Sequence, residues 1–343
     1  MGASILAIDY FLPEETLTNA DLSAQFPEWK IEKIRGKTGI DTRHIAGEGV
    51  CSSDLAVAAA EKLLAGGATR REDVDFLLLC TQTPDYFLPT TACLLQDRLG
   101  LPTHAGALDF NLGCSGYIYG LGLAKGLVET GQASRVLLVT AETYSKLIHP
   151  GDRGARTIFG DGAAATLIGQ DEAGLGSIGP FQYGTDGGGG ANLVVPAGGM
   201  RKPRSADTAL VRTDSGGNRR SEDNLFMNGP EIFTFTLKMV PALVAGLLSR
   251  AQISIEDVDL VVFHQASGFM LDHLRSKLGI PSEKFFVALE ETGNTVSSTI
   301  PIALSQAASR GVLRPGQLVL AAGFGVGYSW GATLIRWPGS IAS

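Results

Sequence analysis

Two apolar segments of the chain begin with the same acidic turn. EDVDFLLLC starts at Glu72, and EDVDLVVF starts at Glu256, 184 residues later. Uninterrupted apolar runs of this length are typical of strands that are buried on both faces of a sheet. The next apolar strands lie in GQASRVLLVTAE from Gly131 and GQLVLAAGFG from Gly316, which are 185 residues apart. Two separate landmarks therefore share nearly the same offset.

A segment with helical character lies between the two strands of each pair. CSGYIYGLGLAKGLVETG starts at Cys114, and TIPIALSQAASRG starts at Thr299. The repeated order of elements predicts that the chain consists of two similar halves. Because strands and helices alternate in each half, we expect an α/β fold with mostly parallel sheets covered by helices.

A stretch of different composition separates the halves. We assign 1–175 to the first half, 176–224 to a connecting flap and 225–343 to the second half. Residues 184–224 are rich in glycine, proline, serine and charge, which predicts a long loop. Its GGGG run is followed by no helix and no GK[ST], which argues against a phosphate cradle. Its basic residues could dock an acidic carrier protein, or the loop could simply be solvated. These residues are Arg201, Lys202, Arg204, Arg219 and Arg220.

Composition narrows the function. The chain is 44% hydrophobic and 18% charged, which is ordinary for a globular enzyme, and its net charge of -7 argues against nucleic-acid binding. No 18-residue uncharged apolar stretch predicts a membrane span, and the start MGASILAIDYFLPEE lacks the basic region of a signal peptide. The four cysteines show no metal-binding spacing. We therefore expect free thiols in a reducing cytoplasm and no metal site.

Cys114 is a candidate nucleophile. It follows the apolar strand GALDFNL and precedes a helix, where unpaired N–H groups and the helix dipole favour thiolate. Its small neighbours Gly113, Ser115 and Gly116 leave room for a substrate. The alternative is a buried structural thiol, an interpretation that fits Cys80, inside an apolar strand, and Cys93.

The duplication indicates that His264 and Asn294 lie at positions that correspond to Cys80 and the Cys114 turn. His264 ends the strand LVVFHQAS, at the carboxyl end where open α/β sheets bind ligands. Asn294 lies in the turn EETGNTVSSTIPIAL, before a helix. With the 184-residue offset, the Asn294 turn matches the Cys114 turn and His264 matches Cys80. We therefore expect these turns and strand ends to face one another across a pseudo-twofold axis.

These motifs together resemble the β-ketoacyl-acyl-carrier-protein synthase III family of thiolase-fold condensing enzymes. The resemblance rests on GCSGY around Cys114, HQA at His264, GNT at Asn294 and the C-terminal GQLVLAAGFGVGYSWGATLIRW. KTGIDTRHIA and DRGARTIFGDGAAATLIG extend it over essentially the whole chain. It implies a five-layered α-β-α-β-α fold built from two duplicated halves, and a homodimer.

The resemblance also implies a mechanism and its substrates. Cys114 would carry the acyl primer as a thioester, and His264 and Asn294 would stabilise the enolate formed when a malonyl thioester loses carbon dioxide. The backbone N–H groups of Cys114 and Val326 would hold the tetrahedral oxyanion. Acyl-CoA or acyl-carrier protein would supply the primer and malonyl-carrier protein the extender, with no tightly bound cofactor.

Two other functions stay open. One is an acyltransferase of the same fold that passes the acyl group to an alcohol or amine without condensation. The other is a non-catalytic partner subunit of a condensing complex, against which Cys114 argues. The intact His264 and Asn294 favour condensation over simple acyl transfer.

Several positions depart from the family pattern. Family residues that help to bind coenzyme A and the phosphopantetheine arm correspond here to Lys37, Ser267, Phe269 and Pro230, while Arg153 is retained and Trp29 lies further upstream. These departures and the long flap favour a specialised synthase of a fatty-acid or polyketide type of pathway, with an acyl-carrier protein as the preferred primer donor.

The acyl pocket also differs from the family. The residue before the proline of the TxxxxxxP segment lines the pocket end, often from the neighbouring subunit, and is commonly phenylalanine. Here Leu88 takes that position and Phe87 precedes it. Alternation along a strand would turn Phe87 away and admit primers longer than acetyl, unless a backbone adjustment returns Phe87 to the gate.

Overall fold

Two mixed sheets with the same strand order form the frame of the molecule. The computed structural model describes residues 2–170 and 177–338. The first sheet has the order β1 (Ala3–Phe11), β7 (Gly162–Gln170), β6 (Arg135–Glu142), β4 (Phe76–Cys80), β5 (Gly106–Phe110). The second has the order β8 (Ser177–Thr185), β15 (Ser329–Arg336), β14 (Leu318–Gly325), β13 (Leu260–Phe263).

Strand directions confirm the duplication. β4 runs parallel to β5 and β6, whereas β6, β7 and β1 are successively antiparallel. Likewise β13 is parallel to β14, and β14, β15 and β8 are successively antiparallel. A single parallel bridge between Val261 and Phe285 stands where a counterpart of β5 would lie. Four of the five strands in the first sheet and three of the four in the second therefore run in one direction, as expected, and only β7 and β15 run the opposite way.

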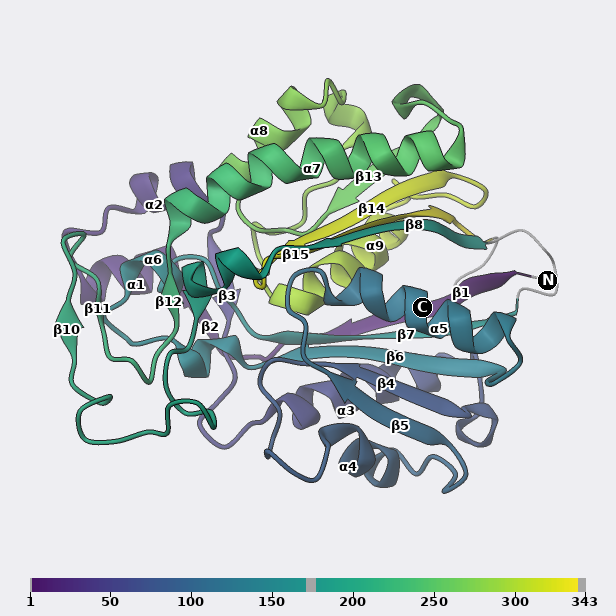
Figure 1. The fold of residues 1–343 in the computed structure, drawn as a ribbon, viewed down its shortest axis with the longest axis horizontal. Helices are drawn as coiled ribbons and strands as arrows, with labels where there is room; N and C mark the ends of the chain where they lie inside the picture. Colours follow the sequence, from purple (N-terminus) through teal and green to yellow (C-terminus); the bar gives the residue numbers. More distant parts are fainter. Residues whose placement is uncertain (1, 171–176, 339–343) are drawn as a thin grey trace.

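Helices complete five layers (Figure 1). α3 (Ser52–Ala65) and α4 (Thr91–Arg98) cover the outer face of the first sheet. α5 (Gly116–Glu129) and α9 (Thr299–Ser309) fill the space between the sheets. α7 (Gly229–Ala251) and α8 (Gly268–Lys277) cover the second sheet from outside. Both predicted central helices thus form, and both contribute one face of apolar residues to the shared core.

The central core explains why α5 and α9 are nearly uncharged. Ile118, Leu121 and Ala124 of α5 and Ile300 and Leu304 of α9 are fully buried between the sheets. Each sheet contributes residues from its inner face to the same cluster. Removing such side chains from water stabilises the fold by roughly 25 cal/mol per Å² of apolar surface, so this layer ties the two halves together.

The connecting segment begins later than expected. The boundary at residue 175 lies outside the described residues, and 177–185 form β8, the first strand of the second sheet. The irregular part therefore follows β8. It contains two small ladders, in which β9 (Leu193–Val194) pairs with β12 (Phe226–Met227) and β10 (Arg212–Thr213) pairs with β11 (Arg219–Arg220). We keep the name flap for residues 186–228.

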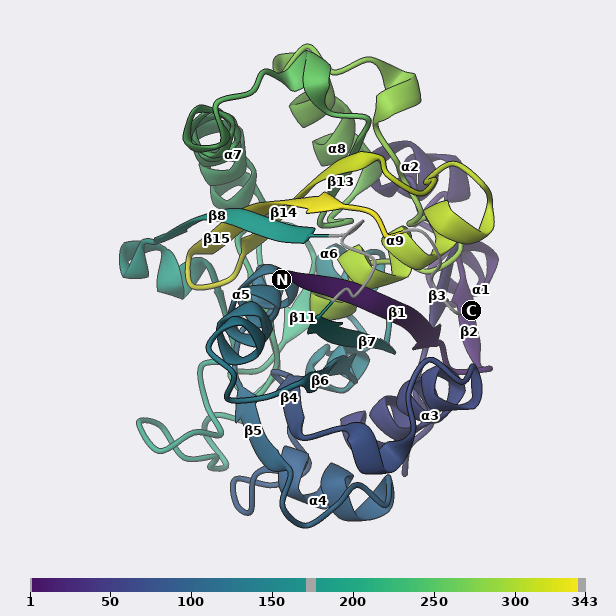
Figure 2. The ribbon, with the colours of Figure 1, turned by 90° about the vertical axis from the view of Figure 1, so that its right-hand side faces the viewer.

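The remaining elements lie beside the flap. β2 (Thr16–Thr18) pairs with β3 (Thr42–His44), next to α1 (Asn19–Gln25) and α2 (Ile31–Thr38). α6 (Arg153–Arg156) follows a 3-10 turn at Tyr144–Leu147. Figure 2 shows α1, α2, β2 and β3 together at one side of the two sheets.

α7 is unusually apolar. Within 2–170 and 177–338 it is the one helix whose length and composition would suffice to cross a membrane. It packs against β8, β14 and β15, and Phe235, Val240, Leu243 and Leu247 are buried. Packing on the sheet accounts for its apolar face.

Candidate active site

The Cys114 turn joins the end of β5 to α5 and lies against β14. Cys114 is 6% exposed and precedes Ser115, the N-cap of α5. A Cβ added to Gly323 would lie 2.5 Å from the Cys114 carbonyl oxygen, and one added to Gly325 would lie 2.8 Å from its sulfur. Only glycine at these positions lets β14 approach the nucleophile turn so closely.

The thiol of Cys114 is protonated in the closed site. Burial raises the pKa of Cys114 to about 12, and hydrogen bonds from the backbone N–H groups of Val326 and of Cys114 itself act in the opposite direction. The expectation that the helix start favours thiolate is therefore wrong for this state, because desolvation outweighs the nearby N–H groups. The same two N–H groups are those expected to form the oxyanion hole, and both lie at the sulfur.

His264 directly follows β13 and is buried, with 2% of its surface exposed. Its backbone N–H donates to the Ala322 carbonyl over 2.8 Å, and its Nδ1 lies 2.7 Å from Oγ1 of Thr299. Burial lowers the pKa of His264 to about 3, against a smaller opposing effect of the Val296 carbonyl. The imidazole is therefore neutral at neutral pH, with one ring nitrogen as donor and the other as acceptor.

Asn294 is fixed from both sides. Its backbone N–H donates to Ile158 O and its carbonyl accepts from Gly160 N–H, each over 3.0 Å. Its side-chain Oδ1 accepts from the Val296 N–H over 2.9 Å, whereas Nδ2 has, within residues 2–170 and 177–338, a single contact of 3.4 Å to Ala266 O. The amide therefore keeps a donor that a substrate carbonyl could use.

Short chains of contacts connect the three predicted residues. Val296 packs in one buried cluster with Cys114 and donates to Asn294. The Val296 carbonyl accepts from Thr299 Oγ1 over 3.1 Å, and Thr299 contacts His264. The facing turns and strand ends expected from the duplication therefore meet at one buried site.

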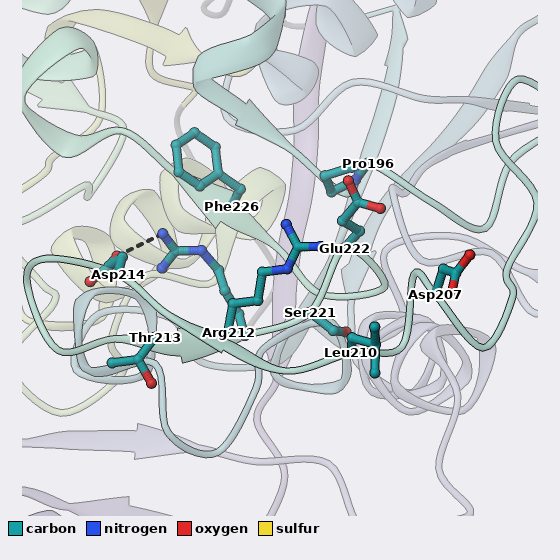
Figure 3. Close-up of a pocket in the computed structure, with 10 residues that line it drawn as sticks. Pro196, Asp207, Leu210, Arg212, Thr213, Asp214, Ser221, Glu222 and Phe226 are labelled. Atoms are coloured by element: carbon teal, nitrogen blue, oxygen red, sulfur yellow. Dashed lines mark hydrogen bonds and ion pairs between the residues drawn. The ribbon is translucent and has the colours of Figure 1, made fainter.

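The base of the flap covers this site. Leu193 and Leu225 are buried in the same cluster as Cys114, Tyr144 and Phe159. The predicted solvated loop describes only the outer part of the flap. There, Arg220 pairs with Asp152 over 3.0 Å and with Asp214 over 2.7 Å. Figure 3 shows a pocket of this outer part, lined among others by Arg212, Asp214 and Phe226. None of the three predicted catalytic residues lines this pocket.

Residues expected to bind the pantetheine arm lie on exposed rims of the molecule. Lys37 is exposed in the last turn of α2, and Ser267 caps α8, whose start contacts the end of α2. Phe269 is 47% exposed and stacks on Phe233. Separately, the Arg153 guanidinium lies 5.9 Å from the ring centre of Trp29, so these two residues are neighbours despite the upstream position of Trp29.

The expected acyl-pocket residues do not line the site within one chain. Phe87 is 78% exposed and Leu88 is 81% exposed. They belong to a loop before α4, not to a strand. The argument from strand alternation is therefore wrong, since no pleat alternates the two side chains.

The other cysteines separate by burial. Cys80 is fully buried in β4, as expected, with its sulfur 2.7 Å from the Leu112 carbonyl oxygen. Cys93 is exposed on α4, so the expectation of a buried structural thiol there is wrong. Its position on the outward side of a helix could not be distinguished from burial in an apolar stretch.

Sequence reasoning missed three residues of the site. They are Thr299, which contacts His264; Val296, which contacts Asn294; and Glu142, a buried carboxyl at the end of β6. Glu142 ends the apolar run RVLLVTAE, and a charge at the carboxyl end of a buried strand was the available signal. One group of three carboxylates in the described ranges, Asp41, Glu290 and Glu291, has metal-like spacing, but Arg35 already pairs with two of them.

Comparison with known proteins gives consistent similarities. The family model for 3-oxoacyl-[acyl-carrier-protein] synthase III matches residues 108–187, and its C-terminal counterpart matches 248–337. The chain is 37% identical over 337 residues to the β-ketoacyl-[acyl-carrier-protein] synthase III of Caldanaerobacter subterraneus subsp. tengcongensis, covering 98% of both proteins.

Solved structures agree with this similarity. The fold matches a crystal structure of a 3-oxoacyl-(acyl-carrier-protein) synthase III with a TM-score of 0.97 and 53% identity, over 98% of this chain and all of that one. It also matches the priming β-ketosynthase of the R1128 polyketide pathway, with a TM-score of 0.85 and 27% identity over 98% of this chain and 97% of the other.

Proposed function

The chain belongs to the 3-oxoacyl-[acyl-carrier-protein] synthase III family of condensing acyltransferases, and on that premise we propose that Cys114, His264 and Asn294 are its catalytic residues. The observation that carries the proposal is the arrangement around one sulfur. The backbone N–H groups of Cys114 and Val326 donate to the thiol of Cys114. Val296, which packs in the same cluster as Cys114, orients the Asn294 amide, and the neutral imidazole of His264 lies next to this turn.

Acyl loading is the first step. The sulfur of Cys114 attacks the carbonyl carbon of an acyl thioester, the N–H groups of Cys114 and Val326 stabilise the oxyanion, and the carrier thiol leaves with the proton of Cys114. The product is an acyl-cysteine. Because the resting thiol is protonated, this proton must pass from the sulfur of Cys114 to the leaving carrier thiol during the attack.

Condensation is the second step. A malonyl thioester loses carbon dioxide, and negative charge develops on its thioester oxygen. His264 through Nε2–H and Asn294 through Nδ2–H donate to that oxygen. This role requires the tautomer of His264 in which the Thr299 hydroxyl donates to Nδ1 and not to the Val296 carbonyl. The carbanion then attacks the carbonyl carbon of the acyl-cysteine. The new carbon–carbon bond forms, the bond from that carbon to the sulfur of Cys114 breaks, and the β-ketoacyl thioester leaves while Cys114 takes up a proton from water.

Substrates and partners follow from the same proposal. Acyl-CoA or acyl-carrier protein supplies the primer and malonyl-carrier protein the extender, with no tightly bound cofactor. The exposed Arg201 and Arg204 of the flap would attract an acidic carrier protein. The departures at Ser267, Phe269 and Pro230 favour a specialised fatty-acid or polyketide type of pathway.

We further propose a homodimer in the cytoplasm. β5 is an edge strand and carries the exposed Leu108. Phe87 and Leu88 lie in the exposed loop before α4, the helix that packs against β5. A second copy at this edge would cover these apolar residues and bring Phe87 and Leu88 towards its acyl pocket. The free cysteines fit a reducing compartment.

Intact-mass measurement tests the nucleophile. Incubation with a panel of acyl-CoAs and acyl-carrier proteins is expected to add one acyl group to the wild type and none to Cys114→Ala. The matched controls Cys80→Ala and Cys93→Ala should load normally. Loading that persists in Cys114→Ala overturns the proposal, and a wild type that never loads would instead fit a non-catalytic partner subunit.

A further inference from the structure

Val296 holds an unusual backbone conformation at the centre of the site. Its φ is +56°, in the left-handed region that β-branched residues rarely adopt, and its side chain is fully buried. Its N–H orients the Asn294 amide, and its carbonyl contacts Thr299, the neighbour of His264. A residue in such a conformation needs support from its surroundings.

That support comes from the other half of the molecule. Ser297 follows Val296 and is 1% exposed, and its Oγ donates to Oε1 of Glu142 over 2.8 Å. Ser298 donates to the Thr140 carbonyl over 3.1 Å. Glu142 and Thr140 both lie near the end of β6, in the first half. The turn that carries Asn294 is therefore attached to a rigid strand of the opposite sheet.

Burial of the Glu142 carboxyl at this position costs free energy. It is fully buried, and no ion pair with it occurs in the described part of the chain. Its other oxygen accepts from the Gln82 N–H over 3.0 Å and from Thr83 Oγ1 over 3.2 Å. A buried carboxyl without a cation is costly, and an apolar side chain would fill the space without that cost. Only a side chain with two polar terminal atoms can hydrogen-bond Ser297 with one atom and the segment Gln82–Thr83 with the other.

We propose that Glu142 is a positioning residue, which through Ser297 holds the Val296 turn that orients Asn294. It does not touch the reacting atoms. The inference rests on the proposed role of Asn294. It predicts that losing the tie slows condensation far more than acyl loading, because loading uses Cys114 and two backbone N–H groups.

Glutamine distinguishes positioning from proton transfer. An amide at 142 can accept from Gln82 N–H and Thr83 while its NH2 donates to Ser297 Oγ, so the tie survives without a titratable group. Burial raises the pKa of Glu142 to about 8, and a protonated carboxyl would make the same pattern. Methionine has a similar length but cannot make the bonds.

The test measures the two half-reactions separately in the full-length enzyme. Cys114 is loaded with whichever of acetyl-, butyryl- and octanoyl-CoA acylates it fastest, followed by mass, and the acyl-enzyme is then mixed with malonyl-carrier protein. Glu142→Met and Ser297→Ala should condense at least tenfold more slowly while loading within threefold of wild type. Glu142→Gln should stay within threefold in both steps, and Glu142→Met/Ser297→Ala should be no slower than the slower single variant.

Each other outcome decides against the inference. Normal condensation in Glu142→Met and Ser297→Ala overturns it, as does an equal loss of loading and condensation, which indicates general disruption. Glu142→Gln as slow as Glu142→Met would indicate a charge or proton role instead. If Glu142→Met does not fold, Ser297→Ala alone carries the test. His264→Ala, measured in the same assay, distinguishes failure of this inference from failure of the proposed function. Normal condensation in His264→Ala would refute the proposed function itself.

Discussion

A Cβ atom placed on Gly325 would lie 2.8 Å from the sulfur of Cys114. Gly325 ends β14 in the second sheet, whereas Cys114 follows β5 in the first. The second half of the chain therefore limits where the sulfur of Cys114, a residue of the first half, can lie. An added Cβ at Gly325 would therefore force the Cys114 side chain to move from its present position.

Gly325→Ala is therefore expected to slow acylation of Cys114 about tenfold or more, because the displaced sulfur loses its alignment with the oxyanion hole. Acyl incorporation followed by mass is the measurement. Gly246→Ala in α7, where an added Cβ meets no atom closer than 3.6 Å, is the matched control and should load normally. Equal acylation rates in wild type and Gly325→Ala would contradict the close packing described here.

His264→Ala and Asn294→Ala should accept an acyl group but form little condensed product. Removing one donor that stabilises a developing oxyanion typically costs on the order of a hundredfold or more in rate. Product formation from pre-loaded enzyme and malonyl-carrier protein is the measurement. Unchanged condensation in both variants would favour an acyltransferase that passes the acyl group directly to an alcohol or amine.

The buried imidazole should make stability depend on pH. The pKa of His264 is about 3 in the folded state and about 6.5 when exposed, so below pH 6.5 the unfolded chain binds a proton that the folded chain does not. Stability is therefore lost as the pH falls from 6.5 towards 3. At pH 5 the loss is about 2 kcal/mol.

Urea unfolding of wild type and His264→Gln at pH 7.5 and pH 5 measures this contribution. The wild type should lose about 2 kcal/mol more than the variant over that interval, since contributions of other groups cancel in the comparison. Equal losses in both proteins would mean that His264 titrates normally in the folded state.

The sequence predicted the elements better than their directions. The four landmark strands and both central helices follow from apolar runs, because burial on two faces leaves a clear pattern. The reversed direction of β7 leaves no such pattern, since a buried strand has the same composition in either direction. β8 was missed because glycine and proline interrupt SIGPFQYGT.

The site was predicted as far as single residues allow. Cys114, His264 and Asn294 lie at turns and strand ends whose positions the duplication relates. The protonated state of Cys114 could not be predicted, because it depends on how deeply the folded chain buries the thiol. Glu142 and Ser297 lie far apart in sequence, and only the packing of the two sheets brings them into contact.

Charge-reversal variants of the flap test the proposed preference for acyl-carrier protein over acyl-CoA as primer donor. Arg201→Glu/Arg204→Glu should weaken loading from acyl-carrier protein severalfold and leave loading from acyl-CoA unchanged, because only the carrier presents a large acidic surface. The wild-type preference should also fall with salt, since exposed charges are screened beyond about 10 Å at 0.1 M. Arg250→Glu, at the end of α7 away from the flap, is the control (Figure 1). Faster wild-type loading from acyl-CoA would contradict the preference.

Leu88→Phe should shift loading towards acetyl and propionyl groups and against medium chains. In a single chain Leu88 and Phe87 are both largely exposed, so neither can limit the primer unless a second copy receives it. If Leu88 closes the partner's pocket, its smaller size leaves room for additional methylenes, each worth about 0.8 kcal/mol on burial, or about fourfold in binding. Phe87→Leu is the matched variant. It should leave the profile unchanged if Leu88 is the gate, and extend it if the backbone returns Phe87 to that position. Wild type that loads acetyl best, with no change in either variant, would show that this loop does not set chain length, and the chemistry of Cys114 would be unaffected by that result.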